Sequence, residues 1–224
     1  MNHWLKTAFG WAALGVALPA AAEPSVLYGR IDGGASFSEA FEGNYIARTG
    51  LGAGSSRSGL VNIGLGAALP IPILSIRSEI DLTYRPDYNF NETSASPTGP
   101  VATRSKFGDI TSMLNVILDV PVPFLIKPFV GLGAGLANNR LSAITTSGGR
   151  VISETGQADA PFAWDAIAGI SYSVAPGIGL DLTYRYVDAG DIKTGGIDGA
   201  GRRIAALHSE LKTRDAMIGL RIGF

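Results

Sequence analysis

The chain has 224 residues, 30 glycines, no cysteine, 17% charged residues and a formal net charge of -1. This length suits one domain or two small ones, and the many glycines argue against a helical protein. A net charge near zero argues against nucleic acid as a partner, and the absence of cysteine excludes disulfides and thiolate metal sites. No internal stretch reaches the run of about 20 apolar residues that a spanning helix needs, so a membrane protein of this sequence must cross with strands.

Residues 1–22 are typical of a secretory signal peptide. Lys6 supplies the positive charge, residues 7–18 form a short apolar core, and the small residues 20–22 form a cleavage site. The alternative is an uncleaved anchor helix, which the short apolar run and Pro19 disfavour. We therefore expect cleavage after Ala22 and a single domain over 23–224.

The remaining chain alternates between apolar and polar residues with a period of two, which predicts strands. In the clearest segment, 74–85, the apolar Ile80, Leu82 and Tyr84 alternate with charged residues. A shift by one residue would place those charges in lipid, at up to roughly 2–4 kcal/mol each near the bilayer midplane. The expected strands, each of about 9–11 residues, are 27–37, 59–69, 74–85, 109–120, 127–137, 162–174, 178–187 and 215–224.

The connections alternate in length. Short proline-marked turns are expected at 70–72, 121–123 and 175–177, and long polar loops at 38–58, 87–106, 138–160 and 188–208. This alternation places all turns at one end and all long loops at the other. It favours an all-β, eight-stranded, antiparallel up-and-down barrel that crosses a bacterial outer membrane.

The aromatic residues fit the same arrangement. Eight of them are expected near the ends of the strands, where lipid meets water: Phe37, Tyr84, Phe162, Trp164, Tyr172, Tyr184, Tyr186 and Phe224. The last strand ends on Phe224 and resembles the C-terminal strand by which outer-membrane proteins are recognised for insertion. Phe224 is therefore the expected assembly signal. The alternative, a soluble lipocalin-like barrel, would place the apolar face inside.

The whole segment 23–224 resembles the opacity-type family of small surface antigens, relatives of the eight-stranded barrel of outer membrane protein A. The resemblance lies in 127–135 (KPFVGLGAG), 162–164 (FAW), 180–186 (LDLTYRY) and 219–224 (GLRIGF). It implies a monomer in the outer membrane of a Gram-negative bacterium, surrounded by lipid and lipopolysaccharide and inserted by the barrel-assembly machinery. Because the family includes adhesins and antigens, it also implies that the loops contact a host or surface ligand.

Charged residues gather on the face that should point into the lumen: Arg30, Asp32, Arg77, Glu79, Asp81, Arg85, Asp165, Asp181, Arg185 and Arg221. They could form an ion path or a plug of salt bridges. An eight-stranded barrel is only wide enough for side chains to fill it, so we expect the plug. Strands 74–85 and 178–187 share the segment Asp-Leu-Thr-Tyr-Arg, whose two copies should lie at similar heights. The partner of Arg185 is then Asp81, Asp181 or Glu79.

Three patterns suggest chemistry on first inspection. His208, Ser209 and Glu210 are the residue types of a hydrolase, but consecutive strand residues point to opposite faces. Glycines at 50–54 and 131–135 do not complete a nucleotide-binding motif, and those at 131–135 should leave room for bulky lumen side chains. Three aspartates between 188 and 198 lack calcium-loop spacing. We therefore expect no enzyme activity, no cofactor and no metal site.

The sequence thus predicts a structural outer-membrane barrel or surface antigen that serves envelope integrity or adhesion through four external loops. Two alternatives remain open: a narrow channel for small solutes, and a lipopolysaccharide-modifying enzyme.

Overall fold

The computed structural model describes residues 26–38, 56–71, 74–94, 101–120, 122–123, 125–147, 150–156, 160–198 and 208–224. Among them, no helix is long and apolar enough to cross a membrane. The predicted signal peptide with Ala22, the first external loop and the glycines at 50–54 lie outside these residues, so the predictions made for them remain predictions.

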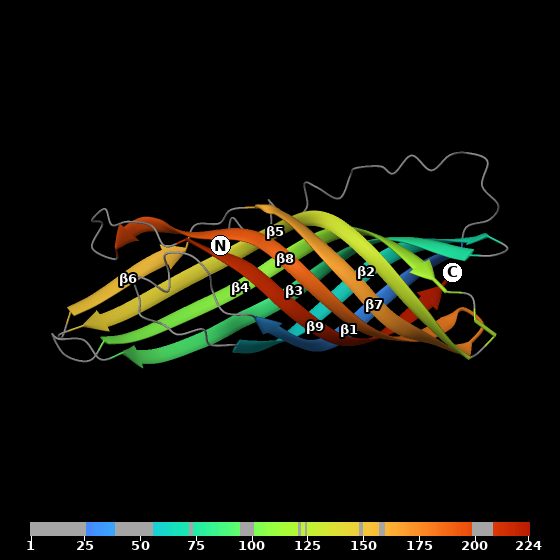
Figure 1. The fold of residues 1–224 in the computed structure, drawn as a ribbon, viewed down its shortest axis with the longest axis horizontal. Helices are drawn as coiled ribbons and strands as arrows, with labels where there is room; N and C mark the ends of the chain where they lie inside the picture. The colour runs from blue at the N-terminus through green and yellow to red at the C-terminus, as the bar shows by residue number, and fades with distance from the viewer. Residues whose placement is uncertain are drawn as a thin grey trace.

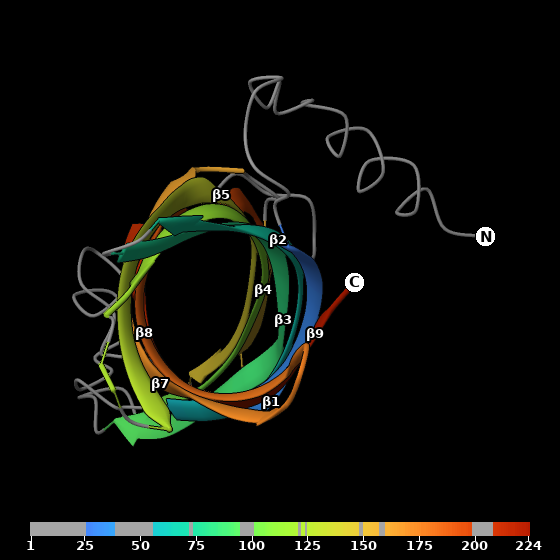
Figure 2. The same ribbon diagram turned by 90° about the vertical axis from the view of Figure 1, so that its right-hand side faces the viewer.

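The described chain is a single antiparallel sheet that closes on itself (Figures 1 and 2). Each long strand pairs with its neighbour along the chain, and β1 pairs with β9 from Tyr28↔Gly223 to Ser38↔Thr213. The prediction of an eight-stranded antiparallel barrel is therefore confirmed. The elements are β1 (Val26–Ser38), β2 (Ser56–Ile71), β3 (Leu74–Ser94), β4 (Val101–Asp119), β5 (Ile126–Ser147), β6 (Arg150–Gly156), β7 (Phe162–Ala175), β8 (Ile178–Asp198) and β9 (His208–Gly223).

The strands are longer than predicted. β3, β4, β5 and β8 have 21, 19, 22 and 21 residues, so the expectation of about 9–11 residues for each strand was wrong. Much of the segments 87–106, 138–160 and 188–208, expected to be loops, continues the hairpins instead. A hairpin in water pairs its own backbone groups and needs no apolar face, so the alternation that marks the membrane section disappears where the strand leaves it.

β6 is a ninth strand within the segment 138–160. It pairs with the outer part of β5 at Ala143–Ser147 and touches β8 near Asp198. Figure 1 shows it at the end of the barrel opposite the C-terminus. Because it lies beyond the barrel wall, it does not change the count of eight wall strands. We call its end of the barrel the loop end, and the other the turn end.

The short connections lie together at the turn end. Ala175 pairs with Ile178, which leaves only Pro176 and Gly177 in the turn, and Gly177 has a φ of 75°. Proline followed by a glycine with positive φ is typical of a type II turn. The Gly223 amide donates to the Gly177 carbonyl at 2.7 Å, and the Phe224 amide donates to the Leu27 carbonyl at 2.8 Å. The last residues of the chain thus fasten β9 to both β1 and the β7–β8 turn.

Apolar side chains cover the outside of the wall and polar ones fill the inside. On β3, Ile80, Leu82 and Tyr84 are exposed, whereas Arg77, Glu79 and Arg85 are at most 1% exposed. The reverse arrangement of a soluble lipocalin-like barrel is therefore excluded. An exposed apolar band around a buried polar interior is the surface of a protein that is surrounded by lipid.

Candidate functional site

The polar interior is the candidate site, and we call it the lumen network. Within the described residues, five arginines share ion pairs with eight acidic residues: Arg30, Arg77, Arg85, Arg185 and Arg221 with Asp32, Glu79, Asp81, Asp109, Asp119, Asp165, Asp181 and Asp215. All ten residues predicted from the sequence belong to it. Asp109, Asp119 and Asp215 were missed, although each has the same strand phase as the polar face that alternation had identified.

Arg77 organises the turn end of the network. Its guanidinium lies 3.0 Å from Glu79, 2.9 Å from Asp119 and 4.0 Å from Asp181, and it stands over the Phe129 ring at 4.9 Å. The ring packs with Ile117 and Ile167 in a small buried apolar cluster. Ile117 is fully buried, so it faces inward and fills space beside the arginine, although it is an apolar residue on a mostly polar face.

Glu79 links this end to the middle of the barrel. It accepts a hydrogen bond from the Tyr28 hydroxyl at 2.6 Å and one from Arg30 Nη1 at 3.2 Å. Arg30 Nε also donates to Asp32 at 2.8 Å, and its Nη2 donates to the Thr183 hydroxyl at 2.8 Å. The five residues come from β1, β3 and β8, so Arg30 connects opposite walls across the lumen.

Arg85 organises the loop end. It donates to Asp109 at 2.6 Å and to Asp215 at 2.5 Å, and both carboxylates are fully buried or nearly so. The Ser36 hydroxyl also donates to Asp215, and Tyr88 donates to Ser36 at 2.6 Å. Hydrogen bonds with charged partners at these distances are among the strong ones, so Arg85 holds β3, β4 and β9 together.

Arg185 lies next to this group and has looser contacts. Its guanidinium is 3.3 Å from Asp81, 3.7 Å from Asp165 and 3.4 Å from Asp215. Of the three partners proposed from the sequence, only Asp81 is among the contacts in the structure. The expectation that the two copies of Asp-Leu-Thr-Tyr-Arg lie level with one another was also wrong. Contacts join Asp81 to Arg185 and Arg77 to Asp181, so the copies meet with an offset along the barrel.

The glycines of β5 admit large lumen side chains, as predicted, but from neighbouring strands. A methyl group on Gly133 would lie 1.7 Å from Asn115 Oδ1 on β4 and 2.4 Å from Asp165 Oδ1 on β7. One on Gly131 would lie 2.8 Å from Ile117. Strand β5 therefore has glycines at these inward positions, and side chains of the neighbouring strands fill the interior there.

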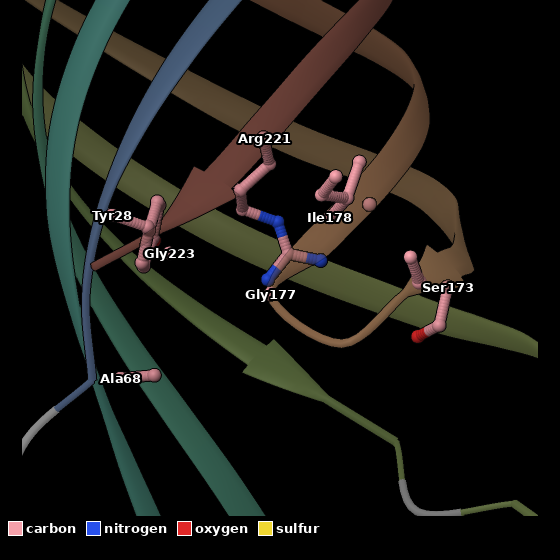
Figure 3. Close-up of a pocket in the computed structure, with 9 residues that line it drawn as sticks. Tyr28, Ala68, Ser173, Gly177, Ile178, Arg221 and Gly223 are labelled. Carbon is pink, nitrogen blue, oxygen red and sulfur yellow. The ribbon is translucent and has the colours of Figure 1, made fainter.

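A cavity of about 150 Å³ opens at the turn end (Figure 3). Its lining includes Tyr28, Ser173, Gly177 and Arg221. The Arg221 guanidinium donates to Ser171 at 2.7 Å, lies 3.2 Å from Asp181 and stands 5.4 Å from the centre of the Tyr28 ring. Figure 3 shows this side chain reaching across the cavity from β9. Arg221 is thus the member of the lumen network that both lines the cavity and pairs with Asp181.

The other patterns yield no chemical site in the described structure. Glu210 is hydrogen-bonded to Lys212 at 2.7 Å, while the side chains of His208 and Ser209 lie outside the described residues. Across the described residues, no group of three or more His, Cys, Asp or Glu is arranged to hold a metal ion. The best-defined arrangement is therefore the lumen network, whose chemistry is that of charge pairing across a narrow interior.

A closed eight-stranded wall, an apolar exterior and a charge-filled lumen define an outer-membrane β-barrel of the outer membrane protein A type. The chain matches the model of the family described as "Outer membrane protein beta-barrel domain" over residues 10–215, and it belongs to that family. It is an outer-membrane protein, as the sequence predicted.

Individual relatives agree with this assignment. The chain is 30% identical to the outer membrane protein PagN of Salmonella typhimurium over 166 residues, which are 67% of this chain and 66% of PagN. Its fold is similar to the solid-state NMR structure of the outer membrane protein AlkL in lipid bilayers, with a TM-score of 0.51, 12% identity and coverage of 93% of this chain and 94% of that one. A major outer membrane protein of Thermus thermophilus also has a TM-score of 0.51, with 9% identity and coverage of 87% of this chain and 99% of that one.

Proposed function

We propose that this protein is a structural surface protein that contributes to envelope integrity or adhesion through its external hairpins. The observation that carries the proposal is the length of those hairpins. The pairing of β2 with β3 ends at Val61↔Tyr84, whereas β3 and β4 remain paired as far as Ser94↔Val101. β5 likewise continues to Ser147 and adds β6. The proposed binding partners are lipopolysaccharide around the wall and a host or surface ligand at the hairpins.

The filled lumen supports this proposal over the alternative of a small-solute channel. Arg77, Arg85 and Arg185 are at most 1% exposed and are held by carboxylates from several strands. An eight-stranded barrel has little room beyond what such side chains occupy. Planar-bilayer recordings of the purified protein test the alternative: steady, large currents from the unmodified protein would favour a channel instead.

Shortening a hairpin tests the adhesive role. Residues 90–105 are replaced by Asn-Gly, which closes β3 and β4 just beyond the pair Asn89↔Lys106. Bacteria that lack other adhesins and carry this variant should bind less to epithelial cells or extracellular matrix than bacteria with the original protein. A heat-modifiability gel confirms equal amounts of folded protein in the envelope. Undiminished binding, both here and after the same operation on residues 144–153, would contradict adhesion through these hairpins.

Phe224 tests the proposed role of the barrel-assembly machinery. Its side chain is 76% exposed, and its amide closes β9 onto β1. Deleting it removes that hydrogen bond and the terminal aromatic residue, so the amount of folded protein in the outer membrane should fall. Replacement by Tyr keeps both features and serves as the control. Equal envelope levels of the deletion and the Tyr variant would refute the role of Phe224.

A further inference from the structure

We propose that Tyr88 is a positioning residue that fixes the external part of the β3–β4 hairpin, residues 88–94 and 101–107, against the lumen network. This part extends beyond β1 and β2 at the loop end (Figure 1). On its β4 side it is supported by pairing with β5. On its β3 side, pairing with β2 ends at Val61↔Tyr84, so within the described residues a hold on that side acts only at the base of the hairpin.

A β-bulge lies at this base. Two residues of β3, 86 and 87, stand between the pairs that Arg85 and Tyr88 form with β4, whereas β4 has only Gly108 there. Residues three apart on a regular strand point to opposite faces. Arg85 and Tyr88 are nevertheless both at most 1% exposed, because the extra residue reverses the alternation. The bulge therefore turns Tyr88 into the lumen.

The two residues that flank the bulge are joined through the seam at which β1 pairs with β9. The Tyr88 hydroxyl donates to the Ser36 hydroxyl at 2.6 Å, and Ser36 donates to Asp215, its direct neighbour across the seam. Asp215 also accepts from Arg85 at 2.5 Å. These contacts form a closed ring, which we call the bulge ring. All four of its residues are at most 1% exposed, so water does not compete for its hydrogen bonds.

A bulge on β8 is closed in a different way. It lies between Asp188 and Asp191 and contains Gly190, which has a φ of 70°. The Gly190 amide donates to the Asp188 carboxylate at 3.1 Å, so the residues of this bulge stabilise it themselves. The bulge on β3 is instead closed through β1 and β9. The direction of the β3–β4 hairpin should therefore depend on the bulge ring.

A second contact reaches the β3 bulge from β2. The Ser58 hydroxyl donates to the Pro86 carbonyl at 2.6 Å, but this hydrogen bond is exposed. Water can replace either partner of an exposed hydrogen bond, so its loss leaves no group unsatisfied. We expect this contact to hold the bulge less firmly than the bulge ring does.

The test uses the full chain, folded in detergent micelles and carrying two spin labels. Because the chain has no cysteine, Thr103→Cys and Ala216→Cys provide the two labelling sites. Thr103 is paired with Glu92 in the external part of the hairpin, and Ala216 is exposed on the outer face of β9. Double electron–electron resonance measures the distribution of distances between the labels. It should be narrow in the otherwise original protein and broader with Tyr88→Phe.

Tyr28→Phe is the matched control. Tyr28 is also buried and its hydroxyl also donates at 2.6 Å, but its acceptor is Glu79 at the turn end. Because that acceptor is charged, Tyr28→Phe should lower the folding equilibrium in urea by about 10-fold or more, at least as much as Tyr88→Phe. The distance distribution should nevertheless stay narrow, since the bulge ring is intact.

Two serine variants locate the effect. Ser36→Ala should broaden the distribution as Tyr88→Phe does, and the double variant should broaden it no further, because both changes break the same hydrogen bond. Ser58→Ala should broaden it less.

Only an effect on adhesion rests on the proposed function. A hairpin that is already held in one direction loses less freedom on binding, so Tyr88→Phe should lower adhesion at equal amounts of folded protein. Adhesion that is unchanged both by Tyr88→Phe and by shortening the hairpin would refute the adhesive role, and the distance distributions would still decide the positioning role.

Equal widths for the original protein and Tyr88→Phe would overturn the proposal. A broadening by Tyr28→Phe as large as that by Tyr88→Phe would overturn it too, because the width would then follow the stability of the whole barrel rather than the bulge ring.

Discussion

The same five residues, Asp-Leu-Thr-Tyr-Arg, occur at 81–85 on β3 and at 181–185 on β8, yet the two copies have different surroundings. Arg85 is held at 2.6 and 2.5 Å by two buried carboxylates, whereas the closest carboxylate to Arg185 is 3.3 Å away. Asp181 is paired with Arg221 and Arg77, while Asp81 is left with one oxygen unsatisfied among the described residues. Identical sequence and strand phase therefore set which way a side chain points, and the neighbouring strands decide what it meets.

The largest effect is expected when the charge of the β8 copy is reversed. Arg185→Glu would place a further carboxylate among Asp81, Asp165 and Asp215. The loss of stability should exceed the roughly 3–5 kcal/mol that follows removal of one partner from a buried pair. Urea unfolding in detergent micelles, followed by circular dichroism, measures the loss.

A second charge reversal distinguishes between Asp81 and Asp181, two of the partners of Arg185 that the sequence left open. Adding Asp81→Arg to Arg185→Glu restores a pair of opposite charges and should recover part of the loss. Adding Asp181→Arg should recover nothing, because Asp181 belongs to Arg77 and Arg221. If both second reversals recovered the same amount of stability, the inferred offset between the two copies would be contradicted.

The β3 copy should be the more sensitive to simple neutralisation of its arginine. Arg85→Met removes the ion pair of Asp109, which is 3% exposed, and leaves the fully buried Asp215 with its longer contact to Arg185 at 3.4 Å. We expect a loss of about 3–5 kcal/mol. Arg185→Met breaks longer contacts, and Asp215 keeps Arg85, so its cost should be smaller. The difference between the two urea midpoints is the measurement. A larger loss for Arg185→Met would reverse the ranking that the distances give.

The membrane section of the fold could be predicted because lipid imposes a strict rule on it. Every second residue must be apolar there, and prolines mark the turns, so the wall strands, their order and their orientation follow from the sequence. Beyond Tyr88 on β3, the alternation between apolar and polar residues ends in the sequence. The strands nevertheless continue because backbone pairing needs no particular side chains.

The lumen network could be predicted in membership but not in pairing. The alternation along each strand places Arg185 and the other predicted charged residues inside the barrel. The tilt of the strands, however, decides which residues of distant strands meet. Arg185 and Asp165 lie on adjacent strands, whereas Arg185 and Asp81 are brought together only by closure of the barrel. The offset between the two copies of Asp-Leu-Thr-Tyr-Arg arises from closure of the barrel, so it cannot be predicted from the sequence of a single strand.

A moderate loss of stability is expected when Arg221, which pairs with Asp181 on β8, is replaced. Its side chain is 21% exposed at the turn-end cavity, and Asp181 keeps Arg77 at 4.0 Å when Arg221 is lost. Arg221→Met should therefore cost about 1.5–3 kcal/mol, in the range for hydrogen bonds to charged groups. Arg221→Lys keeps the charge and should cost less. A loss of stability as large as that of Arg85→Met would show that neither the partial exposure of Arg221 nor the second partner of Asp181 reduces the cost.

The smallest difference is expected at the tyrosines, where the two copies should become equivalent. Tyr84 and Tyr184 point outward and are 54% and 49% exposed, so each meets the surrounding lipid or detergent rather than the lumen network. Tyr84→Leu and Tyr184→Leu should therefore change the free energy of unfolding by amounts within about 0.5 kcal/mol of each other. Measured in the same micelles, this pair controls for strand position, because it changes the same two segments without touching the lumen. If the tyrosine variants differ as much as Arg85→Met and Arg185→Met do, the contrast between the copies belongs to the strands β3 and β8 as a whole. If they agree, the contrast belongs to the inward side chains and to the partners that barrel closure gives them.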